Sequence, residues 1–252
     1  MKKLLYILLF TQAVFAQDAF DKGNEQYRKE KYEQAAQSYE SILKGGQESA
    51  EVYFNLGNAY YKQNRVAPAI YNYEKALLLS PNDKDVLINL DYAQKMVIDD
   101  IKVTPKVGFS RMLYGITGTY HYDTWAWIAV SFSIVSLLLF IGYYFAGTTL
   151  LKRIFFGGMF VAILAIAIAI LSAVFVKSHA AKERPAIVFA EVVSVKSEPT
   201  NNSEDAFVLH EGTKVYVTEE VDNYKKIVLA DDNVGWIESS AIKELKQQPH
   251  HP

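Results

Sequence analysis

The stretch AEVYFNLGNAYYKQNRVAPAIYNYEKALLLSP, residues 50–81, carries the clearest structural pattern in the chain. It repeats the stretch before it, because small and aromatic residues recur at a spacing of 34 positions. Apolar residues within each copy follow helical periodicity. Residues 17–104 are therefore predicted to form pairs of antiparallel helices. The recurring residues are Gly23 with Gly57, Asn24 with Asn58, Ala35 with Ala69, Tyr39 with Tyr73, Glu40 with Glu74, and Leu43 with Leu77.

The second copy resembles the tetratricopeptide repeat. Gly57 and Ala69 would let two helices approach closely, and Pro81 would end the second helix. The first copy is weaker, because its aromatic residue, Tyr27, lies one position late and it lacks the final proline. A third unit begins at residue 84 and is predicted to be a lone helix that caps the stack. The signature positions are filled by Tyr53, Leu56, Gly57, Tyr60, Ala69, Tyr73, Ala76 and Pro81.

The resemblance implies that the concave face of the first helices binds an extended or helical peptide. Two asparagines, Asn24 and Asn55, match positions that grip a carboxylate in some family members. The matching cation positions hold Phe20, Asp85 and Asn89, so a carboxylate clamp is not expected. The alternative is that this face is only solvated. The predicted protein-binding residues are Asn24, Tyr27, Arg28, Asn58, Tyr61, Lys62 and Asn89.

Composition limits the classes of function. The 252 residues carry a formal net charge of −2, which argues against nucleic acid as a partner. The chain has no cysteine, which excludes disulfides, thiolate catalysis and cysteine-ligated metals. Both polar ends are acidic on balance, whereas the apolar middle is basic at its edges. This is the pattern of soluble domains that flank a membrane segment.

The N-terminus has the form of a secretory signal peptide over residues 1–16, with Lys2 and Lys3 before a short apolar run and small residues. Val14 and Ala16 fit the positions before a cleavage site, so Gln17 would become the new N-terminus. The alternative is an uncleaved anchor, although the apolar run is too short to span a bilayer comfortably.

Two further segments, 125–147 and 154–176, are apolar and uncharged. Each would reach roughly 34 Å as a helix, at about 1.5 Å per residue, which is enough to cross a bilayer. The loop 148–153 between them carries Lys152 and Arg153, and basic residues in short loops stay in the cytoplasm. Both soluble ends would then face outward, in agreement with the signal peptide.

The two spans contain no ionisable residue, so they are predicted to be an anchor rather than a transport path. Ala165, Ala169 and Ala173 form a stripe of small residues that would admit another helix closely. The favoured interpretation, however, is ordinary use of alanine in an apolar helix.

From residue 186 the periodicity changes to two, with turn residues between short runs, which predicts a small all-β barrel. Residues 195–199, 209–213 and 235–237 resemble a bacterial SH3-like domain covering 186–246. The resemblance implies a binding module for cell-wall peptides or protein ligands. The tentative ligand-binding residues are Tyr216, Tyr224 and Trp236; for Trp236 a core position is the favoured interpretation and a ligand platform is the alternative.

No motif for catalysis, metal binding or a cofactor is present in the sequence. His210 lies at a predicted strand end and is expected to be structural. The adjacent carboxylates Asp99 and Asp100, and likewise Asp231 and Asp232, are expected to be solvated. We therefore expect a protein that is not an enzyme and needs no cofactor. The other histidines, none in a metal-ligand spacing, are His121, His179, His250 and His251.

The fold class is thus multidomain: an all-α repeat domain, a two-helix transmembrane hairpin and an all-β SH3-like barrel. This order resembles the BatE-type aerotolerance proteins of the Bacteroidetes. The resemblance implies partners among membrane proteins with von Willebrand factor A-type domains, and a role in oxidative stress tolerance or envelope integrity. The predicted segments are 1–16 (signal peptide), 17–104 (repeats), 105–124 (linker), 125–147 and 154–176 (spans), 148–153 (cytoplasmic loop), 177–185 (linker), 186–246 (SH3-like domain) and 247–252 (tail).

Two functions remain open at this stage. The first is a scaffold in the inner membrane, with both soluble domains in the periplasm, that binds proteins through its repeats. The second is a sensor whose SH3-like domain binds peptidoglycan. A transporter subunit is disfavoured by the uncharged spans.

Overall fold

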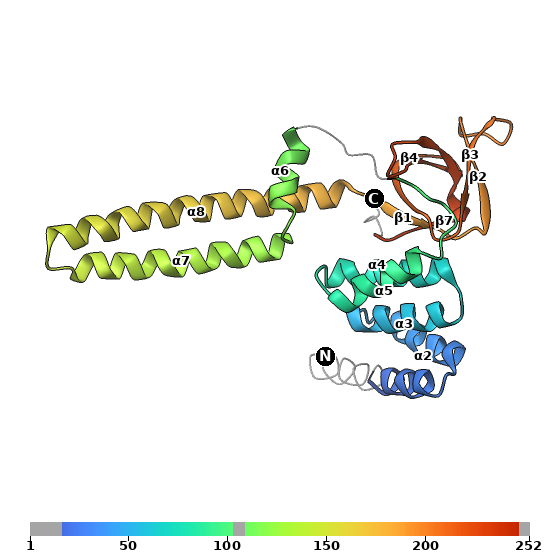
Figure 1. Cartoon of the computed structure of the whole chain (residues 1–252), viewed down its shortest axis with the longest axis horizontal. Coiled ribbons are helices and arrows are strands. Elements are labelled where there is room, and N and C mark those ends of the chain that lie inside the picture. The colour runs from blue at the N-terminus through green and yellow to red at the C-terminus, as the bar shows by residue number, and fades with distance from the viewer. Residues whose placement is uncertain (1–16, 103–108, 247–252) are drawn as a thin grey trace, which may run out of the picture. The chain divides into compact units, whose positions relative to one another are not determined.

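The computed structural model describes residues 17–102 and 109–246, so the predicted signal peptide and tail lie outside the described residues. The chain forms two compact units. One combines residues 1–104 with 184–252 and contains the repeats and the C-terminal sheet; the other, 105–183, contains the two long apolar helices (Figure 1).

The N-terminal part of the first unit is a series of antiparallel helices: residues 17–28, α2 (Tyr32–Lys44), α3 (Ala50–Lys62), α4 (Val66–Leu79) and α5 (Lys84–Gln94). The two repeat units also share an unusual backbone conformation in the turn between their helices. Glu30 and Asn64 lie at equivalent places in two turns, and their φ angles are 59° and 57°. Ser49 and Asp83 begin α3 and α5 by accepting hydrogen bonds from backbone N–H groups. The lone helix expected after residue 84 is α5.

The two repeated glycines lie where paired helices come closest. A Cβ on Gly23 would lie 2.5 Å from the ring of Tyr39, and one on Gly57 would lie 2.7 Å from the ring of Tyr73. Both tyrosine side chains are buried. Glycine at these positions therefore allows the helix contact that the repeat pattern predicts.

The C-terminal part of the first unit is an antiparallel sheet. Its strand order is β3-β2-β6-β5-β4-β1-β7, so hydrogen bonds do not close it between β3 and β7. A register shift between Val217 and Glu219 bends β4. The curled sheet is consistent with the predicted SH3-like barrel (Figure 1). The elements are β1 (Pro185–Val188), β2 (Val192–Lys196), β3 (Asp205–His210), β4 (Lys214–Val221), β5 (Tyr224–Val228), β6 (Val234–Glu238), the 3₁₀ helix η1 (Ser239–Ala241) and β7 (Ile242–Glu244).

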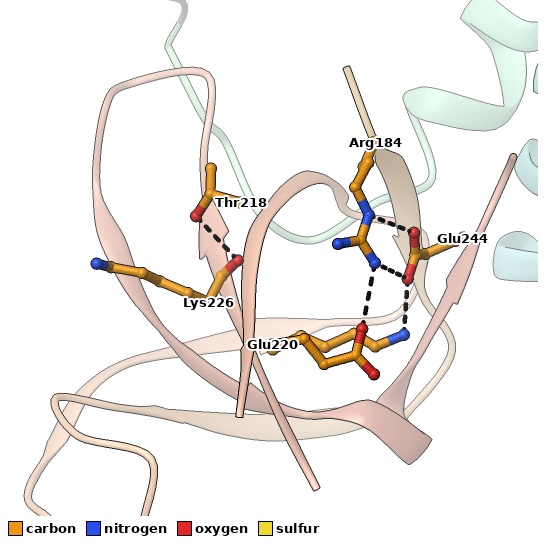
Figure 2. A network of polar contacts seen from close by, with 6 residues as sticks. Arg184, Thr218, Glu220, Lys226 and Glu244 are labelled. Carbon is orange, nitrogen blue, oxygen red and sulfur yellow. Dashed lines mark hydrogen bonds and ion pairs between the residues drawn. The ribbon is translucent and has the colours of Figure 1, made fainter. Parts of the chain in front are cut away.

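A network of charged side chains holds the β7 edge of the sheet (Figure 2). Arg184, just before β1, donates to both carboxylate oxygens of Glu244, at 3.0 and 2.9 Å, and to Glu220 at 3.3 Å. Lys225 on β5 donates to the same Glu244 carboxylate at 2.6 Å. Burial alone would raise the pKa of Glu244, but the hydrogen bonds from Arg184 and Lys225 outweigh it and lower the pKa. The edge strand is thus tied to β5, which is not its neighbour in the sheet.

The helices and the sheet of the first unit share a buried core. Ile187 on β1 and Leu245 after β7 belong to the hydrophobic cluster of the repeat helices. The turn at Gly212, where φ is +87°, approaches Ile70 on α4 so closely that a Cβ would lie 3.1 Å from its side chain. The repeats and the sheet therefore pack as one body, which the sequence did not predict.

Polar contacts reinforce this packing and correct one expectation. Asp99 is not solvated: its carboxylate accepts hydrogen bonds from the His210 backbone N–H at 2.8 Å and from the Thr213 hydroxyl at 2.5 Å. The His210 Nδ1 lies 2.7 Å from the other carboxylate oxygen. Lys214 on β4 pairs with Glu74 on α4 at 2.7 Å. We call Asp99, His210 and Thr213 the Asp99 latch.

The latch favours the ionised carboxylate. Burial alone would raise the pKa of Asp99, but the hydrogen bonds from Thr213 and His210 outweigh burial and lower the pKa below its usual value. The latch is therefore complete at neutral pH.

The second unit contains α6 (Phe109–Thr117), α7 (Tyr122–Phe145) and α8 (Thr149–Lys182). Helix α6 lies inside the expected linker 105–124, and α8 extends the expected span 154–176 at both ends. The indole of Trp125 donates to the Thr117 carbonyl oxygen at 2.7 Å, which ties α7 to the end of α6. Both α7 and α8 are long and apolar enough to cross a membrane.

Small residues line the contact between α7 and α8. Ala162, Ala169 and Ser172 are buried on α8, and Ala129 is buried on α7. Of the predicted alanine stripe, Ala169 is therefore buried, whereas its other two members are half-buried. The helix that this stripe admits is α7 of the same chain.

Candidate functional site

A groove on the first helices of the repeats gathers most of the predicted protein-binding residues. Its cavity has a volume of about 220 Å³. Four of the predicted residues line it, together with Tyr39 and Asn55, which the prediction did not include. The lining residues are Asn24, Tyr27, Arg28, Tyr39, Asn55 and Asn58.

Two copies of one hydrogen-bonded set follow one another along the first helices; the first lines the groove cavity, and the second shares Asn58 with it. In the first copy, Asn24 Oδ1 accepts from the Tyr39 hydroxyl at 2.7 Å and from Asn55 Nδ2 at 3.2 Å. In the second, Asn58 Oδ1 accepts from the Tyr73 hydroxyl at 2.7 Å and from Asn89 Nδ2 at 2.9 Å. The four asparagines form the amide pairs Asn24–Asn55 and Asn58–Asn89.

Among the described residues, each amide pair leaves one amide nitrogen and one carbonyl oxygen without a protein partner. The bond within a pair uses the oxygen of one asparagine and the nitrogen of the other, and every amide side chain has both a donor and an acceptor group. A peptide backbone offers the matching donor and acceptor at every residue. The pairs repeat along the stack, so the groove suits an extended polypeptide.

Buried tyrosines hold these asparagines in place. Burial raises the pKa of Tyr39 to about 12, although Arg28 nearby favours its ionised form. Burial also raises the pKa of Tyr73. Both hydroxyls therefore remain donors at physiological pH, and they fix which way the Asn24 and Asn58 amides point.

Two of the predicted residues are cations: Arg28 lines the groove cavity, whereas Lys62, like Tyr61 and Asn89, is not among its lining residues. Within residues 17–102 and 109–246, neither Arg28 nor Lys62 forms an ion pair. Lys62 is exposed, and Tyr61 beside it is half-buried against the helical core. The rings of Tyr27 and Tyr32 meet edge to face at 5.2 Å. The surface thus combines amide pairs, aromatic rings and unpaired cations.

The three candidate residues on the sheet do not form one site. Tyr224 is buried, and its hydroxyl donates to Asn201 Oδ1. It lines a cavity of about 360 Å³, which Tyr216 and Trp236 do not line. The residues of this cavity are Ala190, Val192, Val193, Ser194, Lys196, Tyr224, Glu238, Ser240 and Ala241.

Trp236 was expected in the sheet core, but it lies neither in that core nor at this cavity. Its neighbours Gly235 and Ile237 are buried, so the pleat places Trp236 on the opposite face. The Lys226 ammonium lies 5.7 Å from its ring centroid. Tyr216 is likewise on the face opposite the buried Val215 and Val217.

In the part of the chain that the structure describes, no group of three histidine or carboxylate side chains is arranged to hold a metal ion. His210, which was expected to be structural, is bound in the Asp99 latch.

Comparison with known proteins supports the repeat assignment. The tetratricopeptide repeat family matches residues 20–84, which include Asn24, Tyr39, Asn55 and Asn58 of the groove. No curated protein matches the chain. The N-terminal part of this protein is therefore a helical region similar to tetratricopeptide repeats, and such repeats suggest binding to other proteins.

Proposed function

We propose that this protein is a scaffold, anchored in the bacterial inner membrane, that binds an extended segment of a partner protein in its repeat groove. The observation that carries the proposal is the recurrence of the amide pairs Asn24–Asn55 and Asn58–Asn89. A peptide backbone bound along the groove would meet the same donor and acceptor twice. Arg28 and Lys62 favour a segment that carries acidic side chains.

The membrane part of the proposal rests on α7 and α8. Two successive spans return the chain to the side from which it started, and the compact first unit contains both ends of the chain. Lys152 and Arg153 lie near the start of α8, and the positive-inside rule assigns this end to the cytoplasm. The repeats and the sheet would then lie in the periplasm.

The partner assignment rests on the order of the parts. Repeats, two spans and an SH3-like sheet in this order resemble BatE-type proteins. We therefore propose partners among membrane proteins with von Willebrand factor A-type domains, in a complex for oxidative stress tolerance or envelope integrity. The proposal gives this chain no catalytic role and no cofactor.

The alternative, a peptidoglycan sensor, has less support. Its three candidate aromatic residues do not form one platform: Tyr224 is buried and bound to Asn201, and Tyr216 and Trp236 do not line the cavity that Tyr224 lines. Lys196 in the same cavity is paired with Asp205 at 2.6 Å. The groove, in contrast, keeps amide groups and cations for a ligand.

The test is affinity purification of the tagged full-length protein from cross-linked membranes in mild detergent, with mass spectrometry of the recovered proteins. We expect a fixed set of membrane proteins, lost when Arg28→Glu, Lys62→Glu and Tyr61→Ala are combined. A matched control with Lys31→Glu and Lys44→Glu, which are exposed elsewhere on the repeats, should keep the set. If the groove variant recovers the same proteins as the wild type, the groove is not the interface.

A further inference from the structure

The last helix of the repeats, α5, has an apolar face that the described residues of the first unit leave exposed. Leu87 is 45% exposed and Ile88 is 53% exposed. Tyr92, one turn after Ile88 on the same side of the helix, is also exposed. We call Leu87, Ile88 and Tyr92 the α5 face. A terminal repeat helix normally presents a polar surface to water, so an exposed apolar face at this position indicates a binding surface.

The internal repeat identifies what covers this position elsewhere in the same chain. Ile88 is equivalent to Phe20 and Phe54 at the repeat spacing. Phe20 packs on Tyr39 with ring centroids 5.9 Å apart, and Phe54 packs on Tyr73 at 6.1 Å. Both tyrosines lie on the second helix of their unit, α2 and α4. In both complete units, a helix therefore occupies the place that is empty beside Ile88.

Within the described part of the first unit, residues 17–102 and 184–246, no helix occupies that place. In the third unit, the stretch equivalent to α4 would begin at residue 100, but residues 99–102 are not helical. They turn to the sheet instead, where Asp99 forms the latch and Ile101 packs on the core. The sheet covers Val97, after the end of α5, through the turn at Gly212, and it leaves Leu87 and Ile88 exposed.

We propose that the α5 face binds an amphipathic helix of a partner protein, which completes the third repeat unit. This surface is separate from the amide pairs. The residue of α5 that belongs to an amide pair is Asn89, which is not part of the α5 face. The partner helix would bring an apolar stripe onto Leu87 and Ile88, as α2 and α4 do for Phe20 and Phe54.

One position restricts the partner further. Gly23 and Gly57 make room for Tyr39 and Tyr73, but the equivalent residue in α5 is Asp91. Its carboxylate pairs with Lys95 at 2.6 Å. A tyrosine would not fit there, so the partner helix must carry a small residue opposite Asp91.

The test uses the full-length protein in the membranes of the cells that make it. A benzophenone amino acid replaces Tyr92 and is photo-cross-linked, and the adduct is mapped by mass spectrometry. We expect an adduct to the apolar face of a helix in another protein, reduced at least fivefold when Leu87→Ser and Ile88→Asp are added. The benzophenone at position 33, which is exposed on α2, is the control and should give no such adduct.

A second measurement separates binding from folding. A synthetic peptide of the mapped helix should bind the purified protein, and the Leu87→Ser, Ile88→Asp variant should bind it at least tenfold more weakly with an unchanged melting curve. Adducts only to lipid, to a second copy, to the same chain or to a non-helical segment would overturn the proposal, as would no adduct above the control. The groove variant should retain the adduct, so the two proposals can fail independently.

Discussion

At the scale of single residues, the environment of Asp99 differs clearly from the one that its sequence context suggests. It follows α5 and precedes another aspartate, a context typical of a solvated helix end. It instead accepts hydrogen bonds from His210 and Thr213, more than a hundred positions away in the chain. Only the folded arrangement of the sheet against the helices brings these residues together.

The first prediction concerns the replacement Asp99→Asn. At pH 7 it should lower the free energy of unfolding of the first unit by about 2 kcal/mol, because it removes the charge from two short hydrogen bonds. Asp100→Asn is the matched control, since Asp100 is exposed, and it should change stability little. The measurement is urea unfolding of the full-length protein in detergent.

The same replacement predicts a pH dependence with a definite sign. The pKa of Asp99 is lowered in the folded protein, so its contribution is present in full above the usual aspartate pKa and is lost as the pH falls through the lowered value. The difference between wild type and Asp99→Asn should therefore be constant near neutral pH and shrink below about pH 4. A difference that grows as the pH falls would contradict this assignment.

At the scale of elements, the seam between α7 and α8 depends on small side chains on one face of α8. Ala169 is buried at this seam, whereas Ala167 is exposed on the other face. Gly142 on α7 is similarly close to Phe155 on α8, where a Cβ would lie 2.9 Å from the ring. Close packing of this kind is the main attraction between helices in an apolar solvent.

The second prediction compares two replacements of equal size. Ala169→Ile should destabilise the α7–α8 hairpin by about 1–3 kcal/mol, because the larger side chain cannot fit between the helices. Ala167→Ile should have little effect. Thermal loss of helicity in detergent, followed by circular dichroism, measures both. Equal effects of the two variants would show that the seam does not determine the stability of the hairpin.

The elements themselves could be predicted largely from local patterns. The recurrence of Gly57 and Tyr73 predicted the close helix pairs, and the alternation around Val215 and Val217 predicted a strand. Local patterns did not reveal that Ile187 and Leu245 are buried against the repeats, because an apolar residue in a strand looks the same whichever core it joins. The groove was predicted in outline, whereas the amide pairs required knowledge of which side chains meet.

At the scale of the whole molecule, the compactness of the first unit constrains the path of the chain. Residues before and after the two apolar helices pack together in that unit. They can do so only on the same side of a membrane. An even number of spans between them satisfies this condition, and α7 and α8 are two helices long and apolar enough to cross a membrane.

The third prediction tests this path and its orientation. The chain has no cysteine, so single cysteines at Asn82, Asn202 and Gly147 can each be labelled without background. All three positions are exposed: Asn82 follows α4, Asn202 lies between β2 and β3, and Gly147 lies between α7 and α8.

A maleimide that cannot cross the inner membrane should label Asn82→Cys and Asn202→Cys from the periplasm. It should label Gly147→Cys only after that membrane is disrupted. If Asn82→Cys and Asn202→Cys were labelled from opposite sides, the hairpin and the shared core of the repeats and the sheet would both be refuted. Labelling of Gly147→Cys alone from the periplasm would instead keep the hairpin and reverse its orientation, and the groove would then face cytoplasmic partners.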